Sequence, residues 1–159
     1  MPSKSAGDSL RNLAFFSGLP DTLLWHLGRA ATRKKLKVDE LLFNEGAPRE
    51  MLAVVLSGEF SIERKQGDEP VQITVLGAGE VIGEAILLDE PNHGTSARAT
   101  QPTEILLFKK EPLMKLLKDQ PALYAALLGK VAKIINARIR RANAALLAGR
   151  TGAWPTPTA

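Results

Sequence analysis

Two glycine–glutamate pairs near the middle of the chain are the residues best suited to ligand chemistry. They are Gly79-Glu80 and Gly83-Glu84, and a short apolar stretch, residues 85–88, follows them. A glycine before a single helical turn leaves backbone N–H groups pointing outward, where they can cradle a phosphate. A carboxylate at the mouth of that turn, here Glu84, can accept hydrogen bonds from sugar hydroxyls. The pattern therefore fits a sugar phosphate, although a tight loop with a solvated glutamate would give the same sequence.

Most other reactive sites lack the residues that they need. The chain has no cysteine, which excludes thiol catalysis, a disulfide scaffold and cysteine-ligated metal centres. It has two histidines, His26 and His93, so a three-histidine metal site is excluded as well. No nucleophilic side chain and general base lie at a spacing that is typical of a catalytic motif. We therefore expect no catalytic residue, no metal ligand and no cofactor, in a protein that is not an enzyme.

The composition indicates one folded domain of ordinary size. The chain has 159 residues, of which 45% are hydrophobic and 24% are charged, close to the average for globular proteins. Its net charge of +4 is small and is typical of a solvated basic surface. No apolar run is long enough for a transmembrane helix, and the N-terminus has no apolar signal core. We therefore expect a cytoplasmic protein without membrane insertion.

The elements that position the two glutamates begin with a helical region. Residues 1–9 are polar and small, which predicts a flexible tail. From Leu10 to Ala31, leucines and phenylalanines recur at three- and four-residue steps, which predicts two short helices. Gly18-Leu19-Pro20 separates these helices, and Asp21 suits the positive end of the second one.

A period of about two residues replaces the helical period after Ala31. Turn signals rich in glycine, proline and acidic residues separate the apolar segments. These segments predict strands at 33–38, 41–43, 51–56, 60–65, 71–76, 95–100 and 104–108. Strands this short, at roughly ten-residue spacing, indicate a sandwich, jelly roll or barrel rather than a parallel sheet. This β unit spans about residues 32–108.

The helical period returns after Phe108 and predicts helices over about residues 110–148. The Asp119-Gln120-Pro121 break divides them into a short helix and a long one. The long helix carries an apolar stripe and would be a rod of about 40 Å. A small barrel cannot cover such a rod, so a second copy of this helix is its simplest partner, which predicts a homodimer; the alternative is a helix folded back on its own barrel with a frayed end. Residues 10–148 thus form one domain, and residues 149–159 predict a disordered tail or a truncated linker.

Four short stretches stand out when the whole chain is considered together. They are Leu13 to Pro20, Glu40 to Gly46, Val54 to Gly58, and Leu76 to Gly79 with the Gly83-Glu84 pair after it. With the closing amphipathic helix, they resemble the cyclic-nucleotide-binding domain family, which includes the catabolite activator protein and the protein kinase A regulatory subunits. The resemblance covers about residues 10–147. It implies a mainly β fold with flanking helices: a double-stranded β-helix, or jelly-roll, barrel with short N-terminal helices and a long C-terminal helix.

The resemblance implies a phosphate-binding cassette, here Gly83 to about Ser96, that binds cAMP or cGMP. In this cassette Glu84 would bind the ribose 2′-hydroxyl, and the N–H groups near Ala85 and Ile86 would meet the cyclic phosphate. Arg138 falls about where the long helix of the family contacts the base, although a solvated arginine beside Arg140 and Arg141 would explain it equally well. The implied ligand-binding set is Gly83, Glu84, Ala85, Ile86, His93, Gly94, Thr95, Ser96 and Arg138.

His93 departs from the family pattern. The family pairs the phosphate with an arginine about ten residues after the cassette glycine, and here His93 holds that position. An arginine offers a fixed charge and a two-pronged donor fork, whereas a histidine offers one donor and is mostly neutral at pH 7. The loss of the charged pair between arginine and phosphate would weaken nucleotide binding by roughly 2–5 kcal/mol. Ile86 stands where the family has a small residue and is expected to crowd the phosphate, and Arg98 falls in the next strand, out of its reach.

These residues leave two functions open. The first is a regulatory module in which nucleotide occupancy repositions the long helix, and the intact Gly83-Glu84 pair favours it. The second is a degenerate module that keeps the fold as a ligand-free dimerisation or docking element, and His93 and Ile86 favour it. DNA binding by this chain alone is not expected, because too few residues follow Ala148 for a recognition helix.

Overall fold

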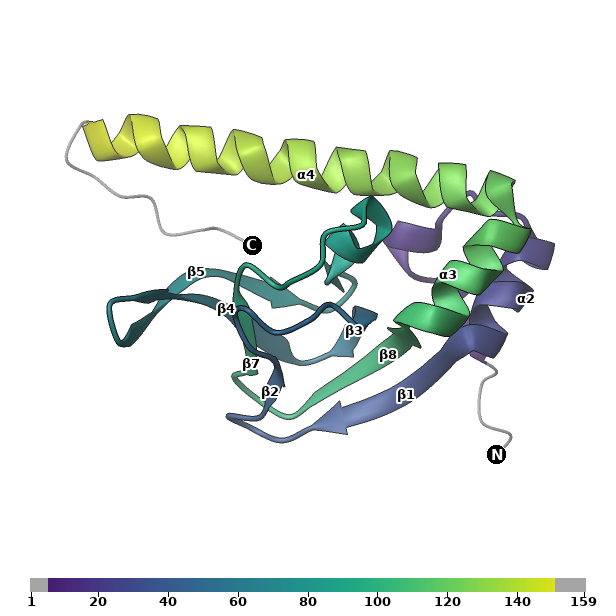
Figure 1. Ribbon diagram of the computed structural model, residues 1–159, viewed down its shortest axis with the longest axis horizontal. Helices are drawn as coiled ribbons and strands as arrows, with labels where there is room; N and C mark the ends of the chain where they lie inside the picture. Colours follow the sequence, from purple (N-terminus) through teal and green to yellow (C-terminus); the bar gives the residue numbers. More distant parts are fainter. Residues whose placement is uncertain (1–5, 151–159) are drawn as a thin grey trace.

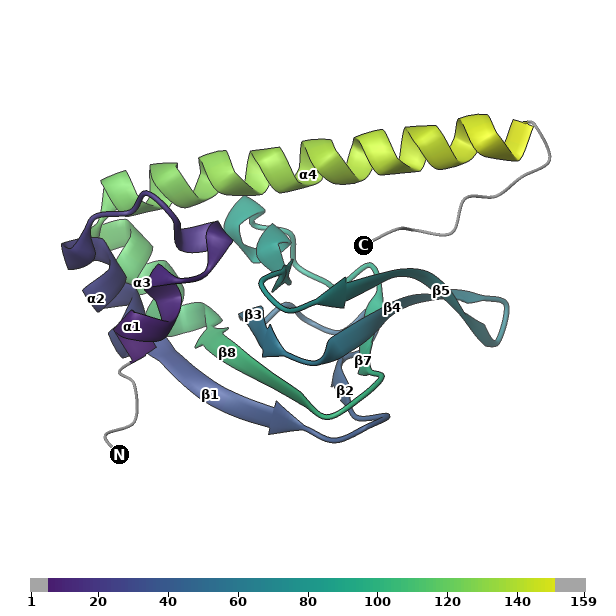
Figure 2. The ribbon, with the colours of Figure 1, turned by 180° about the vertical axis from the view of Figure 1, so that it is seen from behind.

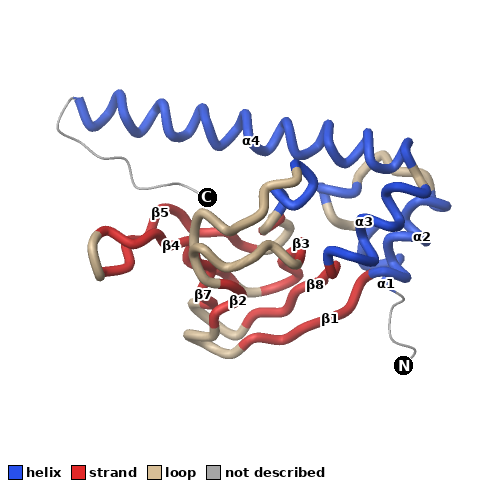
Figure 3. Tube along the Cα trace, viewed as in Figure 1, coloured by secondary structure: helices blue, strands red, loops and turns tan. Residues whose placement is uncertain are grey.

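Two antiparallel four-stranded sheets pack on one another, and helices cover the outer side of one of them (Figure 1). The computed structural model describes residues 6–150. Figure 2 shows from behind how the long helix α4 (Pro121–Arg150) runs along one side of the molecule. Colouring by secondary structure separates the strands from the helical layer (Figure 3). The predicted mainly β fold with flanking helices is therefore confirmed.

In the part of the chain that the structure describes, three short helical segments precede the strands: α1 (Ala6–Arg11), η1 (Ala14–Phe16) and α2 (Asp21–Ala30). Asp21 lies in the first turn of α2, where its charge complements the helix dipole. Because α1 begins at Ala6, the expected tail at residues 1–9 is partly helical, and residues 1–5 lie outside the described part of the chain.

Every predicted strand is present, and no end is shifted by more than two residues. One sheet has the order β1 (Ala31–Leu36), β8 (Thr103–Lys109), β3 (Met51–Ser57), β6 (Val81–Ile82). The other has the order β2 (Leu41–Phe43), β7 (Ser96–Ala99), β4 (Glu59–Gln66), β5 (Glu69–Gly77). Strand β6 was not predicted, because its two residues, between Glu80 and Gly83, are too few to show a period.

The two sheets do not close into a barrel through strand pairing, so the predicted barrel needs a correction. Within residues 6–150, no strand of one sheet pairs with a strand of the other. The turn after β5 connects them instead: the Gly79 N–H donates to the Val55 carbonyl at 2.8 Å, and the Val55 N–H donates to the Glu80 carbonyl at 3.0 Å. Otherwise the two sheets are held together by the apolar side chains that pack between them.

Strand β3 shows how one strand serves two cores. Leu52 and Val54 pack toward the helices, whereas Ala53 and Val55 pack between the sheets. Because successive side chains of a strand point to opposite faces, a strand between two apolar layers is apolar at every position. Burying a large aliphatic side chain contributes about 1.5–3 kcal/mol, so this double burial makes β3 the centre of the fold.

After β8, α3 (Lys110–Asp119) and α4 follow, and α4 is buried over its first half only. Its buried residues are Leu123, Leu127 and Val131, whereas Ile139 is 53% exposed and Leu146 is 62% exposed. α4 extends to Arg150, slightly past the expected end at Ala148, and residues 151–159 lie outside the described part. Across the described residues, none of the helices combines the length and the hydropathy that crossing a membrane requires.

Candidate functional site

The cassette begins on a backbone turn that only glycine suits. Gly83 has a φ of 78°, in the left-handed region, and it precedes the single helical turn η2 (Glu84–Leu88). A Cβ on Gly83 would lie 2.7 Å from the carbonyl oxygen of Met51 on β3. Both the conformation and the close approach therefore require glycine here. The predicted arrangement, a glycine before one helical turn, is confirmed.

Glu84 is buried and forms an ion pair with Arg138 of α4. The carboxylate Oε1 accepts a hydrogen bond from Nη1 of Arg138, and the Glu84 residue is 8% exposed. Arg138 Nη2 also donates to the Val81 carbonyl at 3.1 Å. Arg138 is therefore held by Glu84 and the Val81 carbonyl, and its side chain is 35% exposed rather than fully solvated. The sequence singled out both residues as ligand contacts but gave no sign that they meet, since 54 positions separate them.

The side chain of Ile86, which we expected to lie against the phosphate, lies in the core. It is 2% exposed and packs with Leu87 in the core beneath the helices. Its backbone N–H donates to the Gly83 carbonyl at 3.1 Å and closes the helical turn, so this amide is engaged within η2 itself. The hydroxyl of Tyr124 on α4 donates to the Leu87 carbonyl at 2.9 Å. The helical turn is thus anchored to α4 through both its core side chains and its backbone.

At the other end of the cassette, His93 is buried against an aromatic ring. It is 3% exposed, and its ring stacks on Phe43 of β2 with centroids 3.6 Å apart and planes 5° apart. Its backbone is tied to the β2–β3 loop, because the His93 N–H donates to the Ala47 carbonyl at 2.9 Å and the His93 carbonyl accepts from the Gly46 N–H at 2.7 Å. The position that the family gives to an arginine is therefore inside the fold.

Arg49, which sequence analysis did not single out, is the polar partner of this histidine. Its Nη1 lies 3.3 Å from Nδ1 of His93. Burial, with the positive charge of Arg49 as the smaller cause, lowers the pKa of His93 from 6.5 to about 4. The imidazole is therefore neutral at pH 7. The only signal for Arg49 was a lone basic residue after the Gly46-Ala47-Pro48 turn, which is too common to suggest a site.

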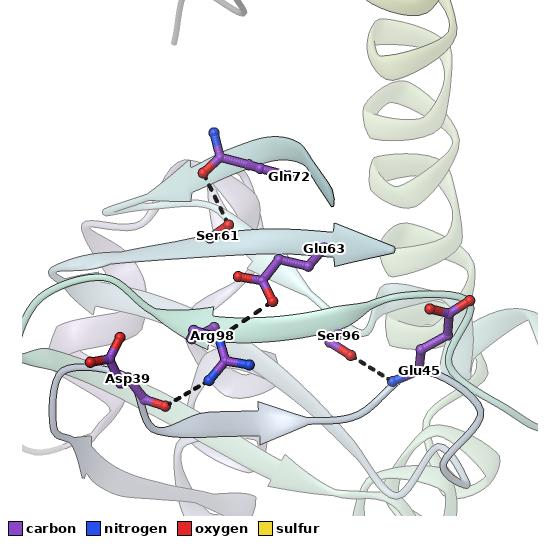
Figure 4. Close-up of polar contacts among 7 residues, drawn as sticks. All are labelled: Asp39, Glu45, Ser61, Glu63, Gln72, Ser96 and Arg98. Atoms are coloured by element: carbon purple, nitrogen blue, oxygen red, sulfur yellow. Dashed lines mark hydrogen bonds and ion pairs between the residues drawn. The ribbon is translucent and has the colours of Figure 1, made fainter. Parts of the chain in front are cut away.

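Gly94, Thr95 and Ser96 are the last residues of the predicted cassette. Gly94 is exposed and Thr95 is half-buried. The Ser96 hydroxyl accepts from the Glu45 N–H at 2.8 Å (Figure 4). Arg98 is held in the sheet, since its Nε lies 3.3 Å from Glu63 and its Nη1 donates to the Asp39 carbonyl at 3.1 Å. Arg98 therefore lies in β7, the strand that follows the cassette, where we expected it.

A pocket of about 360 Å³ lies on the α4 side of the molecule, between η1, the β5–β6 turn and α4. Arg138 lines this pocket and also reaches Glu84, so it connects the pocket with the cassette. Lys130 at the rim is engaged, because its Nζ donates to the Ser17 carbonyl at 2.7 Å. Among the described residues, no group of three histidine and acidic side chains is placed to hold a metal ion.

Known proteins with similar sequences share one domain with this chain. The family model of the cyclic nucleotide-binding domain matches residues 33–120. The cyclic AMP receptor protein of Thermus thermophilus is 33% identical over 81 residues, which are 50% of this chain and 38% of that protein. The lysophospholipase nte1 of Neurospora crassa is 29% identical over 119 residues, which are 74% of this chain and 8% of that protein. The chain therefore spans well under half the length of these relatives.

Solved structures show the same fold. A protein of Geobacter metallireducens, described as cyclic nucleotide-binding, superposes with a TM-score of 0.74 at 23% identity, over 84% of this chain and 97% of that one. The regulatory subunit of a cAMP-independent protein kinase A from Trypanosoma cruzi, bound to guanosine, superposes with a TM-score of 0.66 at 21% identity, over 79% of this chain and 44% of that one. At these identities, the likeness establishes the fold alone.

Proposed function

The chain belongs to the cyclic nucleotide-binding domain family, and from this premise we propose that it is a regulatory module that binds cAMP or cGMP and couples occupancy to α4. The observation that carries the proposal is the ion pair between Glu84 in the cassette and Arg138 on α4. The carboxylate assigned to the ribose by family resemblance is thus also the contact point of the long helix. Any ligand at this carboxylate acts directly on α4.

The carboxylate of Glu84 has enough acceptor positions for both partners. Arg138 contacts Oε1, and an ionised carboxylate has about four acceptor positions on its two oxygens. A ribose hydroxyl therefore binds at Oε2, where it alters the geometry and strength of the ion pair. A ligand that binds more tightly to one position of α4 than to another shifts α4 toward that position by the difference in binding free energy.

The second half of α4 is the proposed output of the module. Ile139 and Leu146 are exposed and lie seven residues apart, which places them on one face of the helix. We infer that this face pairs with the same helix of a second copy and forms a homodimer. In this proposal the module works in the cytoplasm, inserts into no membrane and does not bind DNA through this chain alone.

The alternative is a degenerate module that keeps the fold for dimerisation or docking without a nucleotide. The stacked pair of His93 and Phe43 favours it, because a buried neutral ring stands where the family presents a charged arginine. A nucleoside is a third kind of ligand to test, since the Trypanosoma cruzi neighbour is bound to guanosine, which has no phosphate.

Isothermal titration calorimetry with cAMP, cGMP and guanosine separates these functions. The variants are Glu84→Ala, His93→Arg and, as a matched control on the exposed edge of β5, Glu69→Ala. The proposal expects the wild type and the control to bind a cyclic nucleotide, and expects Glu84→Ala to weaken binding at least about tenfold, the typical effect of losing a hydrogen bond to a charged group. Binding gained only in His93→Arg would support the degenerate module. Absence of binding in every variant would leave the fold as an assembly element.

A further inference from the structure

We propose that the pocket between η1, the β5–β6 turn and α4 is a second ligand site, which binds a small amphiphilic anion: an oxyanion group on a short apolar chain. None of residues 83–96 lines this pocket, so it lies outside the cassette and goes beyond the proposed function. Its turn carries Gly79-Glu80, the glycine–glutamate pair that the cassette does not use.

Positive charge dominates the lining of the pocket. Its four cationic side chains all come from one face of α4: Lys130, Lys133, Arg138 and Arg141. Among the described residues that line the pocket, Glu80 supplies the single carboxylate, and its Oε2 is engaged within its own turn by the Gly77 N–H at 2.8 Å. Four positive charges against one negative charge leave an excess of three, which concentrates anions at this surface.

Two of these cations are held by the fold, and two are available to a ligand. Lys130 and Arg138 donate to backbone carbonyls. The exposed side chains of Lys133 and Arg141 form no hydrogen bond or ion pair with any residue that the structure describes. The guanidinium of Arg141 offers parallel N–H donors that match an oxyanion. Because Arg138 also pairs with Glu84, an anion in the pocket acts on the ion pair that joins α4 to the cassette.

The rest of the lining is largely apolar, which determines the other half of the ligand. Its larger apolar residues come from three elements: Phe15 of η1, Val81 of β6, and Ile134 and Ala137 of α4. An apolar chain covers this surface, whereas an inorganic anion leaves it in contact with water. The volume of about 360 Å³ lies in the range of roughly 300–1,000 Å³ that is typical of small-molecule sites. The lining runs from residue 130 to residue 141 of α4, which is about 16 Å and favours an elongated ligand.

Isothermal titration calorimetry at low salt tests both halves of the ligand without a nucleotide. The probes are octanoate and octyl phosphate, which combine an oxyanion with the same apolar chain. We expect at least one of them to bind saturably. Octan-1-ol, which lacks the charge, and acetate and orthophosphate, which lack the chain, should bind at least about tenfold more weakly. Absence of binding by both amphiphiles, or equal binding of octan-1-ol, would overturn the proposal.

Variants of α4 then locate the bound amphiphile. Arg141→Gln should weaken binding at least about tenfold, as losing a hydrogen bond to a charged group does. Arg140→Gln removes the same charge from an exposed neighbour that does not line the pocket, and it should change the affinity by less than about twofold. Ala137→Leu fills the pocket and should abolish binding, whereas Ala132→Leu, at an exposed position of the same helix outside the pocket, should leave binding unchanged. Circular dichroism checks that each variant is folded.

The same titrations contain the results that would contradict the assignment. Equal effects of Arg141→Gln and Arg140→Gln would show that the anion responds to the net charge of α4 rather than to this pocket. Loss of binding in Lys118→Gln instead would place the apolar chain in the hollow between α3 and α4, which Lys118 lines. Either result would overturn the proposal. Because no nucleotide takes part, a chain that fails to bind cAMP and cGMP still gives a decisive result here.

Discussion

The two ends of the cassette are built in different ways. At the first end, a local motif does the work: Gly83 takes a left-handed turn, and Glu84 follows it at once on η2. At the second end, residues that are distant in sequence hold His93 in place. Its ring stacks on Phe43 and contacts Arg49, which is 44 positions away. The first end keeps the Gly83-Glu84 pair of the family pattern, whereas the second end has a buried histidine at the position of the family's arginine. The first end therefore depends on neighbouring residues, and the second depends on tertiary contacts.

The largest effect is expected at the first end. Gly83→Ala would place a Cβ 2.7 Å from the Met51 carbonyl oxygen and hold a side-chain residue at a φ of 78°. Strain and clash together should lower the free energy of unfolding by about 3–5 kcal/mol. Urea denaturation measures this change. Gly94→Ala, in the same cassette but with open space around its Cβ, is the matched control and should change it by less than about 1 kcal/mol. Equal effects would show that the first end does not depend on its glycine.

The second end predicts a pH effect on stability. The pKa of His93 is lowered from 6.5 to about 4, so between these values the unfolded chain binds more protons than the folded one. The stability that the neutral histidine contributes is complete above pH 6.5 and is lost as the pH falls toward 4. The loss is at most about 3 kcal/mol.

The contribution of His93 to this loss is measured by comparing the unfolding free energies of the wild type and His93→Gln at pH 7 and pH 4. The wild type should lose about 2–3 kcal/mol more than the variant over that interval. Arg49→Ala sharpens the comparison: because burial is the larger cause of the lowered pKa, this variant should retain most of the wild-type slope. Parallel curves for the wild type and His93→Gln would contradict the prediction.

A smaller effect is expected from the ion pair of Glu84 and Arg138. A double-mutant cycle with Glu84→Gln and Arg138→Gln should give a coupling energy of about 1–2 kcal/mol, because the Glu84 side chain is 11% exposed. The control cycle uses Arg33 and Glu104, whose charged atoms are 2.9 Å apart but whose side chains are 44% and 27% exposed. It should give less than about 1 kcal/mol. Similar couplings in both cycles would mean that burial adds nothing at the first end.

The same contrast explains how much of the molecule the sequence could predict. Segments with a period of about two residues predicted the longer strands. A glycine before a short apolar stretch predicted the turn at Gly83. Both are signals within a few neighbouring residues. β6 was missed because two residues are too short for a period, and strand closure was overestimated because hydrogen bonding between sheets depends on the tertiary arrangement.

The pairings within the site depend on contacts that no local signal encodes. Glu84 meets Arg138 because Tyr124 and the core residues of α4 anchor the helix on η2, and His93 meets Arg49 because two loops pair their backbones. Ile86 shows the limit most clearly, since its position in the motif suggested the ligand, whereas its side chain belongs to the core. Residue types indicated where ligand chemistry could lie, and tertiary packing decided which groups meet.

The smallest predicted effect concerns the edge of the second end. The Ser96 hydroxyl accepts from the Glu45 N–H at 2.8 Å and joins β7 to the loop that carries Arg49 (Figure 4). Ser96→Ala should lower the free energy of unfolding by about 1 kcal/mol, since it leaves a half-buried N–H without this acceptor. Ser57→Ala, at an exposed position at the end of β3, is the control and should change it by less than about 0.5 kcal/mol. Hydrogen exchange of the Glu45 amide tests the cause: it should accelerate in Ser96→Ala and stay slow in Ser57→Ala. An unchanged exchange rate would mean that backbone pairing with the cassette, rather than Ser96, holds this loop in place.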